Sequence, residues 1–281
     1  MRINLHKDID AEIKIFFNFL NNKDFPQHRN IVFFKHPELK EKIENIKDSK
    51  EQIKIIAEFI SFFRKKYSNE IDKATEYIDK EIENKGNNAL FVLENLMDFS
   101  NNAEYIIIPT IYPLCPFFNN TFFYSIYDVK NGKVTYDDVV SVSMHEISHM
   151  ILFEILEKNN IFLNKELIYF VKEIIAPVLV YQDDFNGLFE KEIIGNIDAT
   201  EIRFSMNGKT IKAFDFFNEM FIKNKKEGKN FNDFLLSTIN ICKKIENGII
   251  EKHNFWNKNG FEIMNNKELQ EQFKVPIPLN I

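Results

Sequence analysis

The stretch "VSVSMHEISHMILFEIL", residues 140–156, decides most of what the sequence predicts. His145, Glu146 and His149 are polar or charged, and the residues around them are mostly apolar. A polar side chain that is removed from water costs free energy unless a partner satisfies it. The stretch therefore raises the question of whether hydrogen bonds or a bound metal ion satisfies these three side chains.

The spacing of the two histidines favours a metal ion. Residues four apart on a helix lie on one face, one turn apart, so both imidazoles can reach a single tetrahedral zinc ion. Glu146 lies about 100° further round the helix, where its carboxylate can take a proton from water at the metal. This H-E-x-x-H pattern on a helix is the signature of zinc metallopeptidases. We predict His145 and His149 as metal ligands and Glu146 as the general base; the alternative is a pair of hydrogen-bonded core histidines with a surface glutamate.

A third protein ligand is predicted on the next helix, residues 165–182. Catalytic zinc sites use three protein ligands and keep a fourth position open. This helix carries Glu166 and Glu173, which share a face two turns apart. Glu173 interrupts an apolar run, where a carboxylate needs a partner, whereas Glu166 lies near the helix start, where the macrodipole already favours an acid. We therefore predict Glu173 as the third ligand, with Glu166 as the alternative.

At these residues the chain resembles the gluzincin branch of zincin metallopeptidases. In that branch a glutamate on the helix after H-E-x-x-H completes the site, often with a small residue three positions later, as Ala176 follows Glu173 here. The chain departs from the branch at Pro177, where many gluzincins have an aspartate that hydrogen-bonds a ligand histidine. The resemblance covers about residues 118–200. It then requires another second-shell carboxylate, for which the sequence offers Asp183, Asp184 and Asp198.

The resemblance implies a zinc-dependent metallopeptidase that acts on a peptide or protein substrate. It also implies a tyrosine or histidine that stabilises the oxyanion, and Tyr181 and His253 are the residues of these types that we predict for this role. The strand expected over residues 119–129 precedes the zinc helix, as does the edge strand that holds extended substrates in zincins. The alternative for this strand is burial by its own aromatic residues.

Two other functions fit parts of the same pattern. Peptide deformylases also use H-E-x-x-H, with an upstream cysteine as third ligand, and Cys115 lies 30 residues before His145. The glycine-rich segments and the Cys-Leu-Ser neighbourhood of deformylases are absent from this sequence. The chain could also be a non-catalytic zincin-like protein that binds or regulates a partner, although a structural zinc site does not need a base such as Glu146.

The apolar spacing predicts an α+β fold, an α-rich zincin-like arrangement with a small central sheet and the H-E-x-x-H helix lining the cleft. Thr135 with Asp138 resembles a capping box that starts this helix, and Asn131-Gly132 predicts a turn before it. Three regions follow: a helical N-terminal region at 1–102, a catalytic core at 103–205 and a helical C-terminal region at 206–281; one compact unit is also possible. Helices are expected over 8–22, 38–66, 70–85, 88–100, 189–205, 213–227 and 231–247.

Composition excludes several partners. The 36 basic and 42 acidic residues give a net charge of −6, so nothing indicates binding to nucleic acid. No run of 18 uninterrupted apolar residues predicts a membrane span. The first 20 residues lack the apolar core of a signal peptide, and two cysteines make no disulfide framework. We expect a cytoplasmic protein and predict no oligomeric state.

Overall fold

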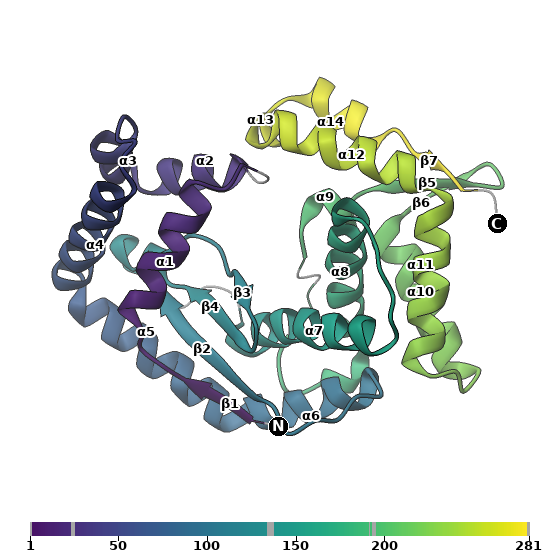
Figure 1. The fold of residues 1–281 in the computed structure, drawn as a ribbon. Coiled ribbons are helices and arrows are strands. Elements are labelled where there is room, and N and C mark those ends of the chain that lie inside the picture. The colour runs from purple at the N-terminus through teal and green to yellow at the C-terminus, as the bar shows by residue number, and fades with distance from the viewer. Residues whose placement is uncertain (1, 24–25, 134–137, 191, 193–194, 280–281) are drawn as a thin grey trace. The chain divides into compact units, whose positions relative to one another are not determined.

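The computed structural model describes residues 2–23, 26–133, 138–190, 192 and 195–279 (Figure 1). The chain divides into two compact units. The first consists of Met1–Asn87 and Ala103–Val139, and the second of Asn88–Asn102 and Val140–Ile281. The chain therefore leaves the first unit, returns to it and leaves again. The predicted division into three regions stays a prediction.

The first unit contains most of the predicted N-terminal helices, with capping residues at their starts. Asp8 accepts a hydrogen bond from Ala11 N at 2.8 Å, and Asp48 accepts one from Glu51 N at 2.9 Å. Because Asp48 starts a new helix, the single helix predicted over 38–66 is wrong, and two helices replace it. The helices are α1 (Ile9–Leu20), α2 (Pro26–Lys35), α3 (Pro37–Ile43), α4 (Ser49–Lys66), α5 (Ser68–Glu81), the π-helix η1 (Ile82–Gly86) and the 3-10 helix η2 (Tyr127–Asn131).

A four-stranded mixed sheet completes the first unit. Its strands are β1 (Arg2–Leu5), β2 (Glu104–Thr110), β4 (Thr121–Ser125) and β3 (Phe117–Phe118), in that spatial order. β2 pairs in parallel with β1 and β4, whereas β3 pairs antiparallel with β4. β3 pairs only with the first two residues of β4, and Phe122, Phe123 and Tyr124 on β4 are buried. The alternative of a strand buried by its own aromatic residues is therefore confirmed, and a substrate-binding role for this strand stays a prediction.

One buried carboxylate joins three elements of the first unit. Glu12 on α1 is fully buried and accepts hydrogen bonds from Arg64 Nε on α4 at 2.7 Å and from Thr110 Oγ1 on β2 at 2.8 Å. The backbone N–H of Ile111 donates a third bond at 2.7 Å. Arg64 also donates to the carbonyl of Pro109 at 2.9 Å. The protein itself therefore satisfies this charge.

The second unit is built mainly from helices, and several of them pack against α8. Helix α8 contacts α9, α10, α11 and α12, which surround it in Figure 1. Nearly all of α6 belongs to this unit as well. The helices are α6 (Asn87–Leu96), α7 (Val139–Lys158), α8 (Lys165–Val180), η3 (Asp183–Phe185), α9 (Ile197–Thr200), α10 (Ala213–Lys226), α11 (Phe231–Lys244), α12 (Glu246–Asn259), α13 (Phe261–Asn265) and α14 (Lys267–Lys274).

A second small sheet lies where the sequence predicted a helix over 189–205. Within that range the described residues form only the short α9 and most of β5 (Arg203–Met206). β5 pairs antiparallel with β6 (Lys209–Lys212) and parallel with β7 (Ile277–Pro278). Asn207 and Gly208 join β5 to β6 with positive φ of 50° and 75°, as a two-residue hairpin turn requires. The helix-rich fold with small mixed sheets confirms the α+β prediction.

Helix α7 lies in the core of its unit. It is the one helix among the described residues that is long and apolar enough to cross a membrane by length and composition, but 83% of its most apolar window is buried inside the protein. A core helix of a soluble protein passes the same test. Burial thus accounts for the apolar composition of α7, and the absence of a membrane span stays a prediction.

Candidate metal centre

The H-E-x-x-H residues lie near the middle of α7, which is buried on all sides. Every residue from 139 to 152 is buried, so this helix is not amphipathic and has no solvent face along that length. Ser148 Oγ donates to the carbonyl of His145 at 2.7 Å and so satisfies its own hydroxyl within the helix. Thr135, predicted to begin the helix, lies outside the described residues. His145, Glu146 and His149 are therefore held in a rigid apolar setting.

Helix α8 brings the predicted third ligand to the same place. Asn164 caps this helix by accepting a hydrogen bond from Leu167 N at 2.8 Å. Glu173, in the middle of the helix, is 3% exposed. Glu166, the alternative ligand, lies in the first turn with an oxygen 3.7 Å from the Lys165 ammonium. Of the two glutamates, only Glu173 belongs to the cluster around the histidines among the described residues.

The three predicted ligands form one compact buried group. The Nε2 atoms of His145 and His149 each lie 3.7 Å from an oxygen of Glu173, the first from Oε2 and the second from Oε1. The donor atoms of the three side chains all lie within 4.8 Å of one another. A tetrahedral zinc ion with bonds of about 2.0–2.2 Å holds its ligand atoms about 3.3–3.6 Å apart. The group could therefore bind a metal ion with small side-chain movements.

One carboxylate oxygen gives an independent test of this fit. Glu173 Oε2 is buried and accepts no hydrogen bond from the described residues. The other oxygen, Oε1, accepts one from the Lys172 ammonium. A buried charged oxygen without a hydrogen bond is costly, whereas a cation beside it would remove that cost. The donor set of two imidazoles and one carboxylate is also a common set for catalytic zinc.

The charges of the site follow from its burial. Burial raises the pKa of Glu173, but the Lys172 ammonium beside it is the main opposing cause and this pKa lies well below its usual value, so the carboxylate is ionised. Burial, reinforced by Lys172, lowers the pKa of His149, which favours the neutral imidazole that a metal needs. For His145 burial acts in the same direction, but Glu173 and Glu146 outweigh it and raise the pKa. Burial raises the pKa of Glu146 to about 7.

Two residues that the sequence reasoning missed lie beside Glu173. Lys172 binds its carboxylate, and the Lys172 ammonium lies 5.2 Å from the ring centroid of Tyr169. Tyr169 is one turn before Glu173 on α8, and its hydroxyl donates to Asp198 Oδ1 at 3.1 Å. Tyr169 lies four residues before Glu173, and this spacing places both side chains on one face of a helix, so the sequence alone could have indicated that Tyr169 lies near the site.

The predicted oxyanion residues lie in different surroundings. The ring of His253 on α12 packs against that of Tyr169 at a tilt of 49°, with 4.7 Å between ring centroids, and its Nδ1 lies 3.8 Å from Asp198 Oδ2. Tyr181 caps the end of α8, with its ring edge against Phe214. His253 thus belongs to a polar cluster that reaches Lys172 through Tyr169. The catalytic roles of His253 and Tyr181 stay predictions.

The remaining candidates have partners of their own. Asp198 accepts the Tyr169 hydroxyl, and Asp184 pairs with Lys225 at 2.6 Å. Asp183 begins η3. A second-shell role for these carboxylates stays a prediction. Cys115 belongs to the first unit, whereas the three-residue cluster is complete within the second.

Comparison with known proteins adds no family to this geometry. No family model, curated protein or solved structure matches the chain. The resemblance to gluzincins therefore depends on the residues quoted above, and the function is inferred from the cluster itself.

Proposed function

We propose that the chain is a zinc-dependent metallopeptidase of the zincin kind that hydrolyses peptide bonds in a peptide or protein. One observation carries the proposal: two histidines of an H-E-x-x-H helix both lie 3.7 Å from a single buried glutamate on the following helix. Three neutral or anionic ligands suit zinc, although the same set can hold other divalent ions.

His145, His149 and Glu173 would hold the ion. A zinc ion bound there lowers the pKa of water and polarises the scissile carbonyl. Glu146 accepts a proton from the attacking water, whose oxygen bonds to the carbonyl carbon. When the carbon–nitrogen bond breaks, Glu146 gives this proton to the departing amine.

His253 and Tyr181 are the two candidates for stabilising the oxyanion. Asp198 lies 3.8 Å from His253 Nδ1, and the Asn257 side chain lies 2.9 Å from its Nε2. Tyr169 connects this ring to the side of the cluster where Lys172 lies. Tyr181 packs on Phe214 and remains the alternative.

Metal content per chain tests the ligand set. We would measure it by mass spectrometry for the wild type, Glu173→Ala and the matched control Glu166→Ala, all purified with added zinc. We expect about one zinc in the wild type and the control and a clear loss in Glu173→Ala. Full zinc in Glu173→Ala, or none in the wild type, would contradict the proposed site.

Peptide hydrolysis tests the reaction. Cleavage of a peptide library by the wild type should fall at least about 100-fold in Glu146→Gln, because the base is lost. Glu146→Gln should keep its zinc, since Glu146 is not a ligand. A wild type that holds zinc but cleaves no peptide would favour the non-catalytic binding protein instead.

A further inference from the structure

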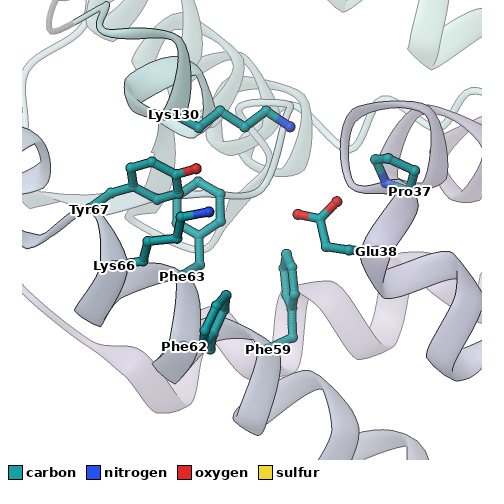
Figure 2. Close-up of a pocket in the computed structure, with 8 residues that line it drawn as sticks. All are labelled: Pro37, Glu38, Phe59, Phe62, Phe63, Lys66, Tyr67 and Lys130. Carbon is teal, nitrogen blue, oxygen red and sulfur yellow. The ribbon is translucent and has the colours of Figure 1, made fainter.

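A pocket of about 390 Å³ lies in the first unit, between α3, the second half of α4 and η2 (Figure 2). Its lining combines four aromatic rings, two lysines and one glutamate. A volume of this size lies in the range of small-molecule sites, about 300–1,000 Å³. Every residue that lines it belongs to the first unit, so the pocket is distinct from the metal centre.

The aromatic rings come from one face of α4 and the residue that follows it. Phe59, Phe62 and Phe63 are spaced three and four apart, and Tyr67 follows Phe63 by four. Phe59 and Phe63 are almost fully buried and form the back of the pocket, whereas Phe62 is 63% exposed at its rim. The rings of Phe63 and Tyr67 lie 4.7 Å apart. Together they offer an apolar surface on which a flat ligand can pack.

Charges of both signs face the same space. Figure 2 shows the carboxylate of Glu38 opposite the ammonium of Lys66, with the ammonium of Lys130 beside them. Glu38 Oε1 lies 3.9 Å from Nδ1 of His36, and the described part of the chain shows no ion pair between Glu38 and either lysine. Lys66 lies over the Tyr67 ring at 5.1 Å, and Lys130 donates to the carbonyl of Lys35. The lysines and the glutamate therefore share a pocket without neutralising one another.

We propose that this pocket binds a small zwitterion with an aromatic side chain, the chemistry of a free aromatic α-amino acid. A simple anion would leave the Glu38 carboxylate without a partner, and the two lysines would repel a simple cation. A zwitterion satisfies both signs, because its ammonium pairs with Glu38 and its carboxylate with Lys66 and Lys130. Its ring packs on the phenylalanines of α4.

Calorimetric titration of the full chain with L-phenylalanine tests this proposal. A chelator is present throughout, so that a metal ion in the other unit cannot bind the amino acid. The matched ligands are L-phenylalanine amide, which lacks the carboxylate, and N-acetyl-L-phenylalanine, which lacks the ammonium. We expect L-phenylalanine to bind at least about tenfold more tightly than either, since each blocked ligand leaves one charge of the pocket without a partner.

Three variants separate the pocket from a general effect of charge. Glu38→Gln should weaken L-phenylalanine about tenfold and should abolish the preference over N-acetyl-L-phenylalanine. Phe62→Ala should weaken all three ligands, because it removes shared apolar contact. Glu41→Gln changes the same charge on α3 at an exposed position outside the pocket and should bind as the wild type does. All three positions are exposed, so the variants should fold, which circular dichroism would check.

The titrations of the three ligands and the variants decide between a specific site and a general effect of charge. Selective binding of L-phenylalanine that is lost in Glu38→Gln and kept in Glu41→Gln supports the proposal. No binding of L-phenylalanine overturns it, and so does equal binding of the three ligands. An equal loss in Glu38→Gln and Glu41→Gln would also overturn it, because net charge and not the pocket would then set the affinity.

Discussion

Each unit of the molecule buries a glutamate, and the two differ in how their charge is satisfied. Glu12 in the first unit is fully buried and accepts three hydrogen bonds of 2.7–2.8 Å from Arg64, Thr110 and the backbone of Ile111. Glu173 in the second unit is 3% exposed, and its Oε2 accepts no hydrogen bond from the described residues.

The buried histidines of the two units also differ in what their Nε2 atoms meet. His36 in the first unit bonds the carbonyl of Ile111 through Nε2 at 2.9 Å, while its Nδ1 has no hydrogen bond within the described residues. The Nε2 atoms of His145 and His149 instead point to Glu173 from 3.7 Å, which exceeds a hydrogen bond and suits two ligands of one metal ion. The hydrogen bonds of Glu12 thus hold elements of the first unit together, whereas the spacing of His145, His149 and Glu173 could accommodate a metal ion.

The largest expected effect follows from removing the cation that satisfies Glu12 in the first unit. Arg64→Met leaves Glu12 buried without its cation, which should lower the free energy of unfolding by about 3–5 kcal/mol. Urea denaturation followed by circular dichroism measures this loss. Lys65→Met, at the exposed neighbouring position, is the matched control and should change little. An equal loss in both variants would contradict the structural role of the Glu12 network.

Metal binding should stabilise the protein through Glu173 and independently of the Glu12 network. Zinc at about one hundred times its Kd should raise the free energy of unfolding of the wild type by about 2.7 kcal/mol, and a chelator should reverse this gain. Glu173→Gln should abolish the gain, whereas Arg64→Met should keep it. Thermal denaturation with and without zinc measures the effect, and a gain that persists in Glu173→Gln would sink the assignment of this ligand.

His36 should make the free energy of unfolding of the first unit depend on pH. Burial lowers its pKa from 6.5 to about 4, with Lys130 and Lys35 reinforcing this shift and the Ile111 bond and Glu38 opposing it. The unfolded state therefore binds a proton more readily below pH 6.5, and the free energy of unfolding falls as the pH drops. Between about pH 7 and pH 5 the loss from His36 should be about 2 kcal/mol.

Urea denaturation of the wild type and His36→Gln at both pH values isolates this contribution. The variant should unfold more easily at neutral pH, and the gap between the two proteins should narrow in acid. Other groups affect both proteins alike, so only the change in the gap is compared. A gap that stays constant with pH would contradict a buried neutral His36.

The smallest expected change in stability concerns the hydrogen bond between Tyr169 and Asp198. Tyr169→Phe removes the hydroxyl that bonds Asp198 and should cost about 1 kcal/mol, with the zinc content unchanged because the ring remains. Tyr181→Phe is the matched control on the same helix. Loss of zinc in Tyr169→Phe would show instead that this hydroxyl supports the ligand Glu173.

Local sequence signals predicted the two helices of the metal centre and the cluster that they form. The H-E-x-x-H spacing fixes one face of α7, and Glu173 stands out because an apolar run surrounds it. Tyr169 was missed, since its contacts are with Asp198 and His253, which only the fold brings close. Lys172 was missed although it directly precedes Glu173 in the sequence, because a lysine beside a glutamate on a helix does not by itself indicate a contact. The sheet at β5 and β6 was also missed, although Asn207-Gly208 carries the same Asn-Gly signal as Asn131-Gly132, which lies at the end of the 3-10 helix η2.

The interleaved course of the chain has a consequence for its synthesis. Residues 88–102 are made before the central strands of the first unit, yet they pack with the second. Asp98 accepts its hydrogen bond from Phe231 N at 2.5 Å, from a residue 133 positions later, and Asn101 bonds Glu154 at 3.0 Å. During translation this segment therefore lacks its packing partners until most of the chain has been made. A gene fragment that starts at residue 140 would encode the proposed metal ligands but not residues 88–102, which belong to the same unit.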